Sequence, residues 1–459
     1  MLYEDTIQEN NHPAFNNPEY FEGTLAAKTY DHYENGIKEK RLGIDVFTHC
    51  YTVGMVCKLL LTTKRISKRT KEWLSEYIDI NCLPYFFSLH DIGKLGPGFQ
   101  ALIRPLINEI EGCIKKHEIV SYYHLLNKYI PRSLARCILH HHGYYRYDKK
   151  ISRAKSGLGG NKWVIKRDEL LEKLSKAFNC PLKIEIKKEI PIEVLKYLAG
   201  FLSFCDWIAS DDKIFNPEFY SINTVEEKIK NAFIQYGIIN EIDIEEVFPS
   251  FYDIFEFDPY GFQKDTSEAI TGPGLYIIEA PMGMGKTEAA LYPAFKLCYE
   301  GKAEGIYFAM PTCTTSDKIH ERMKKYIKNA FGENHTTQLI HGKAALKDVG
   351  VNNNVNGLCT WYKGNKRAIL AKFGVGTIDQ ALLSMLPTAR YLFMRTFGLK
   401  GKVVIFDEVH SYDCYTNGIL FELIKELLKM ECTVIILSAT LTNKLRNELI
   451  NCVQEVKNG

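Results

Sequence analysis

The second half of the chain repeats a pattern that few folds accommodate. Short apolar runs there end in small or polar residues, and longer stretches with helical spacing separate them. Strands that are apolar along their whole length are typical of a buried parallel sheet with crossover helices. The runs are residues 275–278, 305–308, 403–406 and 433–437. Residues 259–459 are therefore predicted to form an α/β domain with a mainly parallel sheet.

The first half lacks this pattern. Its apolar residues fall at helical spacings, and histidines and aspartates are dispersed among them, so residues 1–225 are predicted to be all-helical. Residues 226–258 alternate between charged and apolar character and end near Asp258-Pro259, which indicates a connecting segment. A chain of 459 residues is also too long for one ordinary core, which favours a multidomain protein.

Three features place the chain in a broad class. No apolar run is long enough for a membrane span, and the acidic N-terminus is unlike a secretory signal. Thirteen cysteines, an odd count without a CxxC pair, indicate reduced thiols in a cytoplasmic protein. Because no long apolar run is present, no membrane partner is expected. The net charge is only +3, so an argument for nucleic-acid binding has to rest on local patches.

A glycine-rich loop at 280–287, with the sequence APMGMGKT, follows a predicted strand and precedes a helical stretch. Gly283 and Gly285 allow backbone N–H groups to turn toward phosphates, and the helix start adds a favourable dipole. Lys286 would reach the terminal phosphates of ATP, and the Thr287 hydroxyl would hold its Mg²⁺. The first glycine of the usual motif is replaced by Ala280.

Two acids close another predicted strand. Asp407 and Glu408 follow residues 403–406 directly. Asp407 is suited to hold the magnesium of a bound nucleotide, and Glu408 to polarise the attacking water. This pair strengthens the prediction of an ATP site.

Further short motifs indicate which class of ATP-binding protein the chain resembles. They are Gln263, Pro311-Thr312, Gly376-Thr377 and Ser438-Ala439-Thr440. Together with the loop and the acidic pair, they resemble superfamily 2 helicases over about 260–442. The resemblance implies a RecA-like domain in which Gln263 is placed for adenine. It also implies that the motifs at 311 and 376 contact the nucleic-acid backbone, and that the motif at 438 couples hydrolysis to movement.

Such motors have two RecA-like domains with ATP between them. The chain stops at Gly459, about twenty residues after Ser438-Ala439-Thr440. We therefore expect the second RecA-like domain to be absent, and ATP to be bound without productive unwinding.

The first half carries a set of metal-binding residue types around His90-Asp91-Ile92-Gly93-Lys94. An imidazole beside a hard carboxylate suits Mn, Fe, Ni or Mg. The residues that accompany this motif are His49, His117, His140, His141, His142 and Asp206. They suffice for two divalent ions, which could clamp both the attacking and the leaving oxygen of a phosphodiester. Asp91 is the natural bridging ligand, and Lys94 is suited to neutralise charge on the phosphate.

The ordered pattern of these residues resembles the HD superfamily of metal-dependent phosphohydrolases. An HD domain followed by a superfamily 2 motor resembles the CRISPR-associated helicase–nuclease of type I systems, over nearly the whole chain. The metal ligands that this resemblance implies are His49, His90, Asp91, His117, His141, His142 and Asp206. It also implies recruitment by an RNA-guided surveillance complex to an R-loop, where the displaced single-stranded DNA is nicked and degraded with ATP.

Two basic segments remain open to interpretation. Residues 146–167 carry eight Lys or Arg against one acid, Asp148, and they follow His142. A basic loop there could guide single-stranded DNA, or it could be an ordinary solvated loop. For residues 64–71 a solvated helix terminus is favoured.

The main hypothesis is thus a metal-dependent single-stranded DNA nuclease fused to an ATP-dependent helicase motor. One alternative is an HD nucleotide phosphohydrolase, although the motifs at 376 and 438 would be of no use to it. The other is a non-catalytic binding fragment, which an incomplete motor would explain.

Overall fold

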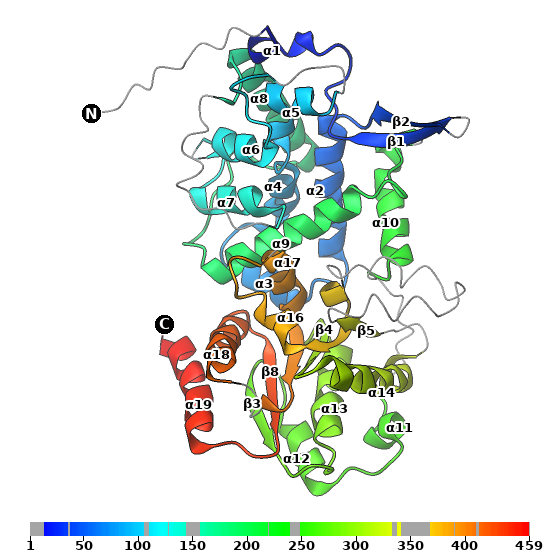
Figure 1. Cartoon of the computed structure of the whole chain (residues 1–459), viewed down its shortest axis with the longest axis vertical. Helices are drawn as coiled ribbons and strands as arrows, with labels where there is room; N and C mark the ends of the chain where they lie inside the picture. The colour runs from blue at the N-terminus through cyan, green and yellow to red at the C-terminus, as the bar shows by residue number, and fades with distance from the viewer. Residues whose placement is uncertain are drawn as a thin grey trace. The chain divides into compact units, whose positions relative to one another are not determined.

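The computed structural model describes residues 13–34, 37–104, 110–126, 128–143, 157–218, 220–238, 248–332, 337–340, 368–389, 391–409 and 413–458. The chain divides into two compact units (Figure 1). The first contains residues 1–62 and 73–232, and the second contains residues 63–72 and 233–459.

The first unit is built mainly from helices around a buried aromatic core. Its central helix, α2 (Val46–Thr62), buries eleven of its 17 residues, as expected for a helix that is surrounded by others. Phe86, Phe87, Phe201 and Phe204 are fully buried beside it. The other helices are α1 (Pro13–Asn16), α3 (Lys68–Ser75, which continues from the second unit), α4 (Leu83–Ser88), α5 (Pro97–Leu102), α6 (His117–Leu125), α7 (Arg132–His140), α8 (Asn161–Phe178), α9 (Ile192–Ala209) and α10 (Val225–Gln235), with short 3₁₀ turns at Pro18–Tyr20, Ile80–Cys82, η3 (Ile92–Lys94) and Ile222–Thr224.

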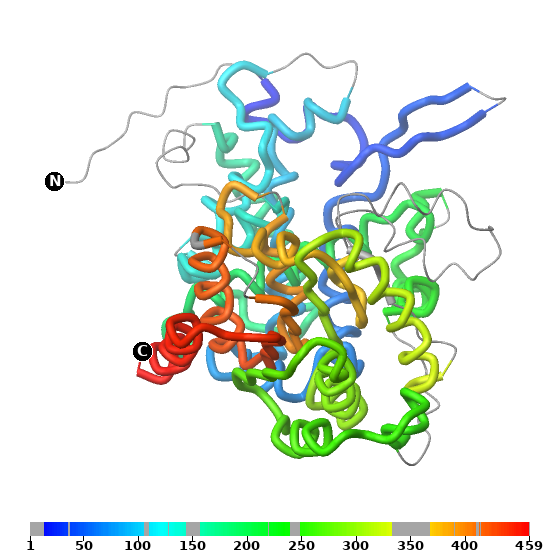
Figure 2. Tube along the Cα trace, turned by 60° about the horizontal axis from the view of Figure 1, so that its bottom comes forward, coloured from blue at the N-terminus to red at the C-terminus, as the bar shows by residue number. Residues whose placement is uncertain are grey.

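One part of the first unit differs from the all-helical prediction. Strands β1 (Thr29–Glu34) and β2 (Ile37–Leu42) pair antiparallel, with Thr29 opposite Leu42. Figure 2 shows this hairpin standing out from the helices of its unit. No residue of either strand is buried. The hairpin therefore has no apolar face, and its sequence lacks the alternation of polar and apolar residues that would predict strands.

The second unit contains a six-stranded sheet in the order β3-β8-β7-β4-β6-β5, in which every neighbouring pair is parallel. The strands are β3 (Gly274–Glu279), β4 (Gly305–Met310), β5 (Thr337–Ile340), β6 (Phe373–Thr377), β7 (Lys402–Phe406) and β8 (Thr433–Ser438). The predicted parallel α/β domain is thus confirmed. β5 and β6 were not predicted, because β5 has only four residues and β6 contains two glycines.

Helices precede, connect and follow the strands of this sheet. They are α11 (Phe251–Phe255), α12 (Gly261–Ala269), α13 (Lys286–Tyr299), α14 (Cys313–Phe331), α16 (Ile378–Leu382), α17 (Leu392–Leu399), α18 (Cys414–Lys429) and α19 (Asn443–Asn458), with a 3₁₀ turn at η9 (Ala368–Leu370). Because all strands run the same way, the loops after β3, β7 and β8 emerge at one edge of the sheet. The glycine-rich loop, Asp407 and Ser438 therefore share that edge.

Residues 63–72 form part of the second unit although they lie early in the sequence. A guanidinium nitrogen of Arg65 donates to the Leu370 carbonyl oxygen (2.6 Å), and the Thr70 hydroxyl donates to Glu304 (2.7 Å). Arg69 also pairs with Glu431 (2.8 Å between Nε and Oε2). Several residues of the run at 64–71 therefore make hydrogen bonds or an ion pair within the second unit, whereas a solvated helix terminus was predicted.

Within the ranges described above, no helix is both long enough and apolar enough to cross a membrane.

Candidate metal centre and nucleotide loop

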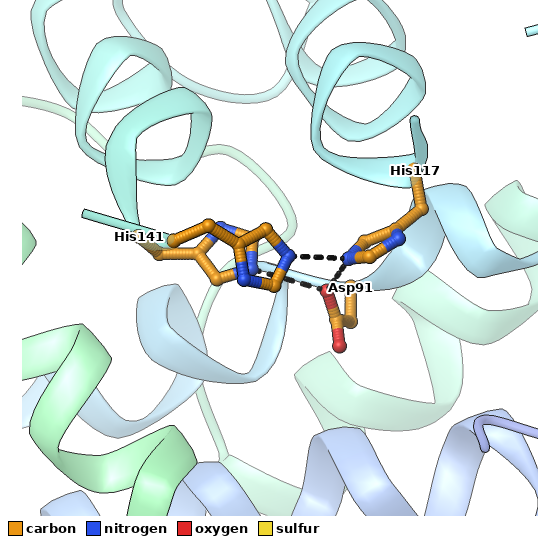
Figure 3. Close-up of side chains that lie close together, drawn as sticks. Asp91, His117 and His141 are labelled. Atoms are coloured by element: carbon orange, nitrogen blue, oxygen red, sulfur yellow. Dashed lines mark hydrogen bonds and ion pairs between the residues drawn. The ribbon is translucent and has the colours of Figure 1, made fainter. Parts of the chain in front are cut away.

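Asp91 lies at the centre of a group of histidines in the first unit (Figure 3). Helix α4 ends at Ser88, and His90 and Asp91 occupy the turn before η3, where Asp91 is 1% exposed. The two carboxylate oxygens face different partners. Oδ2 lies 3.0 Å from His49 Nε2 and 3.1 Å from His90 Nε2. Oδ1 lies 3.1 Å from His117 Nε2 and 3.4 Å from His141 Nε2.

The Oδ2 side forms what we call the inner cluster, made of His49, His90, Asp91 and Asp206. Helices α2 and α9 deliver His49 and Asp206, and Asp206 Oδ1 lies 3.5 Å from His49 Nε2. The side chain of Asp206 is only 13% exposed, and both histidines are fully buried. One ligand atom from each residue lies within 4.8 Å of the others, which is a spacing that one cation could bridge.

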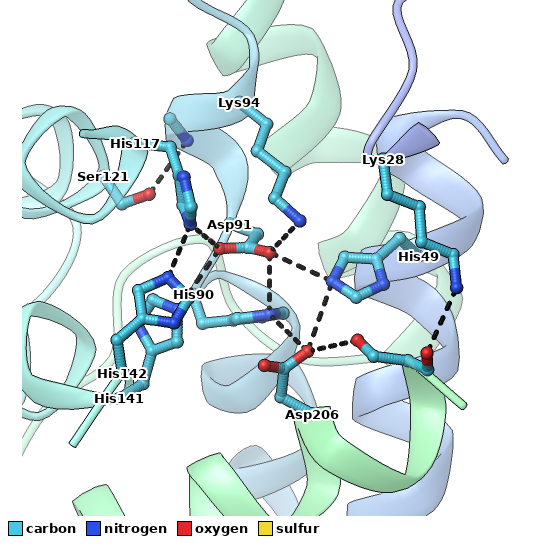
Figure 4. Close-up of polar contacts among 12 residues, drawn as sticks. Lys28, His49, His90, Asp91, Lys94, His117, Ser121, His141, His142 and Asp206 are labelled. Atoms are coloured by element: carbon cyan, nitrogen blue, oxygen red, sulfur yellow. Dashed lines mark hydrogen bonds and ion pairs between the residues drawn. The ribbon is translucent and has the colours of Figure 1, made fainter. Parts of the chain in front are cut away.

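The Oδ1 side forms the outer cluster, made of Asp91, His117, His141 and His142. His117 begins α6, and the other two histidines follow the end of α7. The Nε2 atoms of His117 and His142 lie 2.8 Å apart (Figure 4). Of the three histidines at 140–142, His141 and His142 join the cluster and His140 does not, which is the arrangement expected from the sequence.

Several buried atoms in the two clusters test whether the residues suit metal ions. Among the described residues, His90 Nε2, Asp91 Oδ1 and His141 Nε2 are buried and lie near other ligand atoms, but they make no hydrogen bond of regular geometry. Leaving such a group unsatisfied costs about 1–3 kcal/mol. The Nδ1 atoms of His90 and His141 lie 3.0 Å and 2.6 Å from the carbonyl oxygens of Phe87 and Ile138.

In the neutral form of each imidazole, which is the form that binds metal, these carbonyl contacts place the proton on Nδ1, so that the Nε2 lone pair points into the cluster. Imidazole nitrogens combined with carboxylate oxygens are the donor set of divalent transition-type metals. The residues therefore fit two such ions.

Charges in the centre are mutually balanced. Lys94 Nζ lies 2.6 Å from Asp91 Oδ2, and both side chains are buried. Burial opposes ionisation of Asp91, but the positive charges of His90, Lys94 and His117 outweigh it and hold its pKa well below the usual range. Burial likewise disfavours the charged form of His90, but Asp91 and Asp206 raise its pKa to about 9.

Two other histidines of the centre are kept neutral. Burial and the charge of Lys94 lower the pKa of His49 to about 4. The charge of His141 and burial lower the pKa of His142 to about 2. A neutral imidazole is the form that binds metal.

Residues that were not predicted support these ligands. The Ser210 hydroxyl donates to Asp206 Oδ1 (2.9 Å), and Lys28 Nζ donates to the Ser210 carbonyl oxygen (3.2 Å; Figure 4). The Gly93 N–H donates to the Ser121 hydroxyl (2.8 Å), which ties the turn to α6. Serine and lysine are common at many positions, so no sequence signal singles these residues out.

The glycine-rich loop of the second unit leads directly into α13. Gly285 caps that helix with φ +80°, a left-handed conformation that favours glycine. Lys286 Nζ donates to the carbonyl oxygens of Ala280 (2.6 Å) and Pro281 (3.2 Å). Met282 is 77% exposed, so this side of the loop is open.

Gln263 lies against the glycine-rich loop. Its Oε1 accepts the N–H of Tyr260 (2.9 Å), and its Nε2 donates to the Gly285 carbonyl oxygen (3.0 Å). Gln263 is 1% exposed, and both of its amide atoms are engaged at the loop. Contact with adenine stays a prediction.

The acidic pair and the serine motif end neighbouring strands. Asp407 follows β7, and its Oδ1 accepts the N–H of Glu408 (3.0 Å), which adopts φ +52°. Ser438 ends β8, is fully buried, and its carbonyl oxygen accepts the N–H of Ala280 (3.3 Å). The serine motif is thus bonded to the start of the glycine-rich loop.

The two motifs expected on nucleic acid also end adjacent strands, since Met310 of β4 pairs with Thr377 of β6. Thr312 is exposed and caps α14. Thr377 is 5% exposed, and its carbonyl oxygen accepts the Tyr307 hydroxyl (2.8 Å).

Part of the basic segment at 146–167 proves to be core. Helix α8 begins at Asn161, Trp163 is fully buried, and Arg167 is 1% exposed. Residues 144–156, which hold the rest of that segment, lie outside the described residues, as does His410 after the acidic pair.

Comparisons with known proteins identify the families that the two parts of the chain resemble. Residues 30–215 match the family model of the Cas3 HD domain, and residues 260–448 match that of the DEAD/DEAH box helicase. The chain is 30% identical over 431 residues to the CRISPR-associated nuclease/helicase Cas3 of Streptococcus thermophilus, covering 79% of this chain and 46% of the relative. It spans about half the length of the curated relatives that it matches.

Two solved structures are similar. The crystal structure of T. fusca Cas3 superimposes with a TM-score of 0.77 and 25% identity, over 95% of this chain and 52% of the other. A chain from a CRISPR RNA-guided surveillance complex in a pre-nicking state shares the fold, with a TM-score of 0.67 and 24% identity over 93% of this chain and 49% of the other.

Proposed function

The chain belongs to the Cas3 family of CRISPR-associated nuclease/helicases, and on that premise we propose that it is a metal-dependent nuclease acting on single-stranded DNA in type I CRISPR interference. Its HD domain would cut the strand. Its DEAD/DEAH box domain would be part of an ATP-dependent motor that feeds DNA to that site.

One observation carries the nuclease proposal: Asp91 presents one oxygen to each of two histidine clusters. Two divalent cations bound there would supply a clamp for the attacking and leaving oxygens of a phosphodiester. His49, His90 and Asp206 would hold one ion, His117, His141 and His142 the other, and Asp91 both. Five imidazoles among seven ligands favour a transition-type metal such as Mn, Fe or Ni over Mg.

Lys94 is proposed to act on the substrate rather than on a metal. Its ammonium group already balances the charge of Asp91, and the nearby carboxylates raise its pKa despite burial. A permanently charged group at this position would stabilise negative charge on a phosphate oxygen.

For the motor we propose that Lys286, Thr287 and Asp407 bind ATP with Mg²⁺, with Gly283 and Gly285 shaping the loop around the phosphates. Glu408 would polarise the attacking water. The carbonyl of Ser438, bonded to Ala280, offers a route by which a change at the nucleotide reaches the serine motif.

The proposed partner is an RNA-guided surveillance complex with its R-loop, which would present the displaced strand. The support is the shared fold with a chain from such a complex and membership in the family.

Incubation of the protein with circular single-stranded DNA and Mn²⁺, with and without ATP, would test the nuclease proposal. Asp91→Ala or His90→Ala should abolish nicking and lower bound metal while ATP binding persists. Glu185→Gln, which changes an exposed carboxylate of the same unit outside both clusters, should still nick. Undiminished cleavage by purified Asp91→Ala protein would contradict the nuclease proposal.

A further inference from the structure

The turn that carries Asp91 and Lys94 is held through its backbone by three side chains. The Gly93 N–H donates to the hydroxyl of Ser121 (2.8 Å). The next two carbonyl oxygens, of Lys94 and Leu95, accept Gln100 Nε2 (2.9 Å) and Arg167 Nη1 (2.7 Å). All three of these side chains are buried, and they come from α6, α5 and α8.

The turn depends on such bonds because its own backbone is irregular at both ends. Asp91 has φ −113° and ψ +15°, and Leu95 has φ −77° and ψ +72°, so neither residue continues a helix. Buried backbone groups outside a helix or sheet need partners from side chains. The position of the Asp91 carboxylate between the two clusters therefore rests on these contacts.

Arg167 is the unusual member of the three. It is a cation, it is 1% exposed, and it contacts none of the ligands of the two clusters. Burying a guanidinium group is costly unless its hydrogen bonds are satisfied. Its Nη1 also donates to the Leu158 carbonyl oxygen (3.1 Å), and its Nε donates to His124 Nδ1 (3.2 Å).

A polar chain behind Arg167 fixes its orientation. His124 accepts from Arg167 on Nδ1, so its proton is on Nε2, 2.9 Å from Asp168 Oδ1. Asp168 also accepts the Tyr129 hydroxyl (2.7 Å) and Lys128 Nζ (2.9 Å). The Arg167 guanidinium is thus hydrogen-bonded to His124 through Nε and to the Leu95 carbonyl oxygen through Nη1.

We propose that Arg167 is a positioning residue for the metal centre, acting through the Leu95 carbonyl on the turn that presents Asp91 and Lys94. This role rests on the proposed function of the two clusters as a metal site. A lysine could not replace it, because only the planar fork of arginine reaches Leu95, Leu158 and His124 in fixed directions.

Cobalt binding by the full chain tests this role without relying on activity. The visible absorption of bound Co²⁺ reports the geometry of its ligands, and calorimetry gives the affinity. Arg167→Lys should alter the cobalt spectrum and weaken binding about 10–100-fold, as changes behind metal ligands do. Lys166→Met, which removes a neighbouring exposed charge on α8, should leave both unchanged.

An Arg167→Lys protein that folds and shows the wild-type spectrum and affinity would overturn the positioning role while leaving the proposed function intact. If that variant does not fold, His124→Gln takes its place, since it replaces the imidazole that accepts from Arg167 Nε and donates to Asp168. A smaller shift of the same kind would support the role, and an unchanged spectrum would overturn it. Failure of the wild-type chain to bind cobalt would instead overturn the proposed function, and this role with it.

Discussion

A methyl group on Gly93 would lie 2.1 Å from the carbonyl oxygen of His117, so the turn that holds Asp91 packs directly on the start of α6. Gly93→Ala is therefore expected to displace His117 from Asp91. His117 Nε2 and Asp91 Oδ1 lie 3.1 Å apart in the wild type. We expect loss of metal from the outer cluster and a destabilisation of about 1–3 kcal/mol. Metal analysis and thermal melting check this, with Gly418→Ala, at an exposed and open position, as the control. Full metal content in Gly93→Ala would contradict the expectation.

The two clusters should lose their ions separately. His142→Ala removes a ligand of the outer cluster only, and His49→Ala one of the inner cluster only. We expect each variant to retain about one ion of the two that a bridged site holds, and Asp91→Ala to retain neither. Mass spectrometry of the metal content after gel filtration distinguishes these cases. Equal loss of both ions in His142→Ala would mean that the clusters do not bind independently.

His124 should make folding stability depend on pH. Burial and the charge of Arg167 lower its pKa from 6.5 to about 3 in the folded protein. The unfolded chain therefore takes up a proton that the folded protein does not, so the stabilising effect is complete above pH 6.5 and is lost as the pH falls toward 3. The slope is at most about 1.4 kcal/mol per pH unit.

Urea unfolding of the wild type and of His124→Gln, at several pH values with chelator present, isolates this dependence. Because glutamine does not titrate, the stability advantage of the wild type should shrink between pH 6.5 and 4. A difference that stays constant over that range would show that His124 is not held neutral.

Lys286→Ala should weaken nucleotide binding and leave the fold and the metal centre unchanged. Among the residues that the structure describes, Lys286 Nζ donates to carbonyl oxygens of its own loop, so the fold should tolerate its loss. We expect affinity for a fluorescent ATP analogue to fall at least about tenfold, because the phosphates lose their cation. Lys296→Ala, at an exposed position of the same helix, is the matched control. Metal content and nicking of single-stranded DNA should be normal in both.

The residues that the structure brings together in the two clusters were all predicted from the sequence, through their ordered pattern and the resemblance that it carries. His49 and Asp206 lie in otherwise apolar helices, and His90 lies in the turn after an apolar helix, so these polar residues stand out in the sequence. Their supports could not be found in this way. Ser121 and Gln100 act through the backbone, and any polar side chain of suitable reach could do the same.

Arg167 shows how a charge count can mislead. It was assigned to a basic segment because that segment contains many cations, yet Trp163, Arg167, Leu170 and Leu174 are all buried on α8. Their spacing of three to four residues is the helical period, and it was the available signal for a buried face. The β1–β2 hairpin had no such signal, since its strands bury nothing.

The membership of residues 63–72 in the second unit has a consequence for how the protein can be dissected. The chain passes from one unit to the other, returns, and passes over again, so no single cut yields two whole domains. A fragment that begins at residue 259 would lack the donors that meet Glu304 and Leu370. The complementary fragment would carry Arg65 and Thr70 without their acceptors, the Leu370 carbonyl oxygen and the Glu304 carboxylate. Two independently made halves are therefore expected to be less stable than the same halves joined, and a design that transplants this short segment would be needed to separate the two units cleanly.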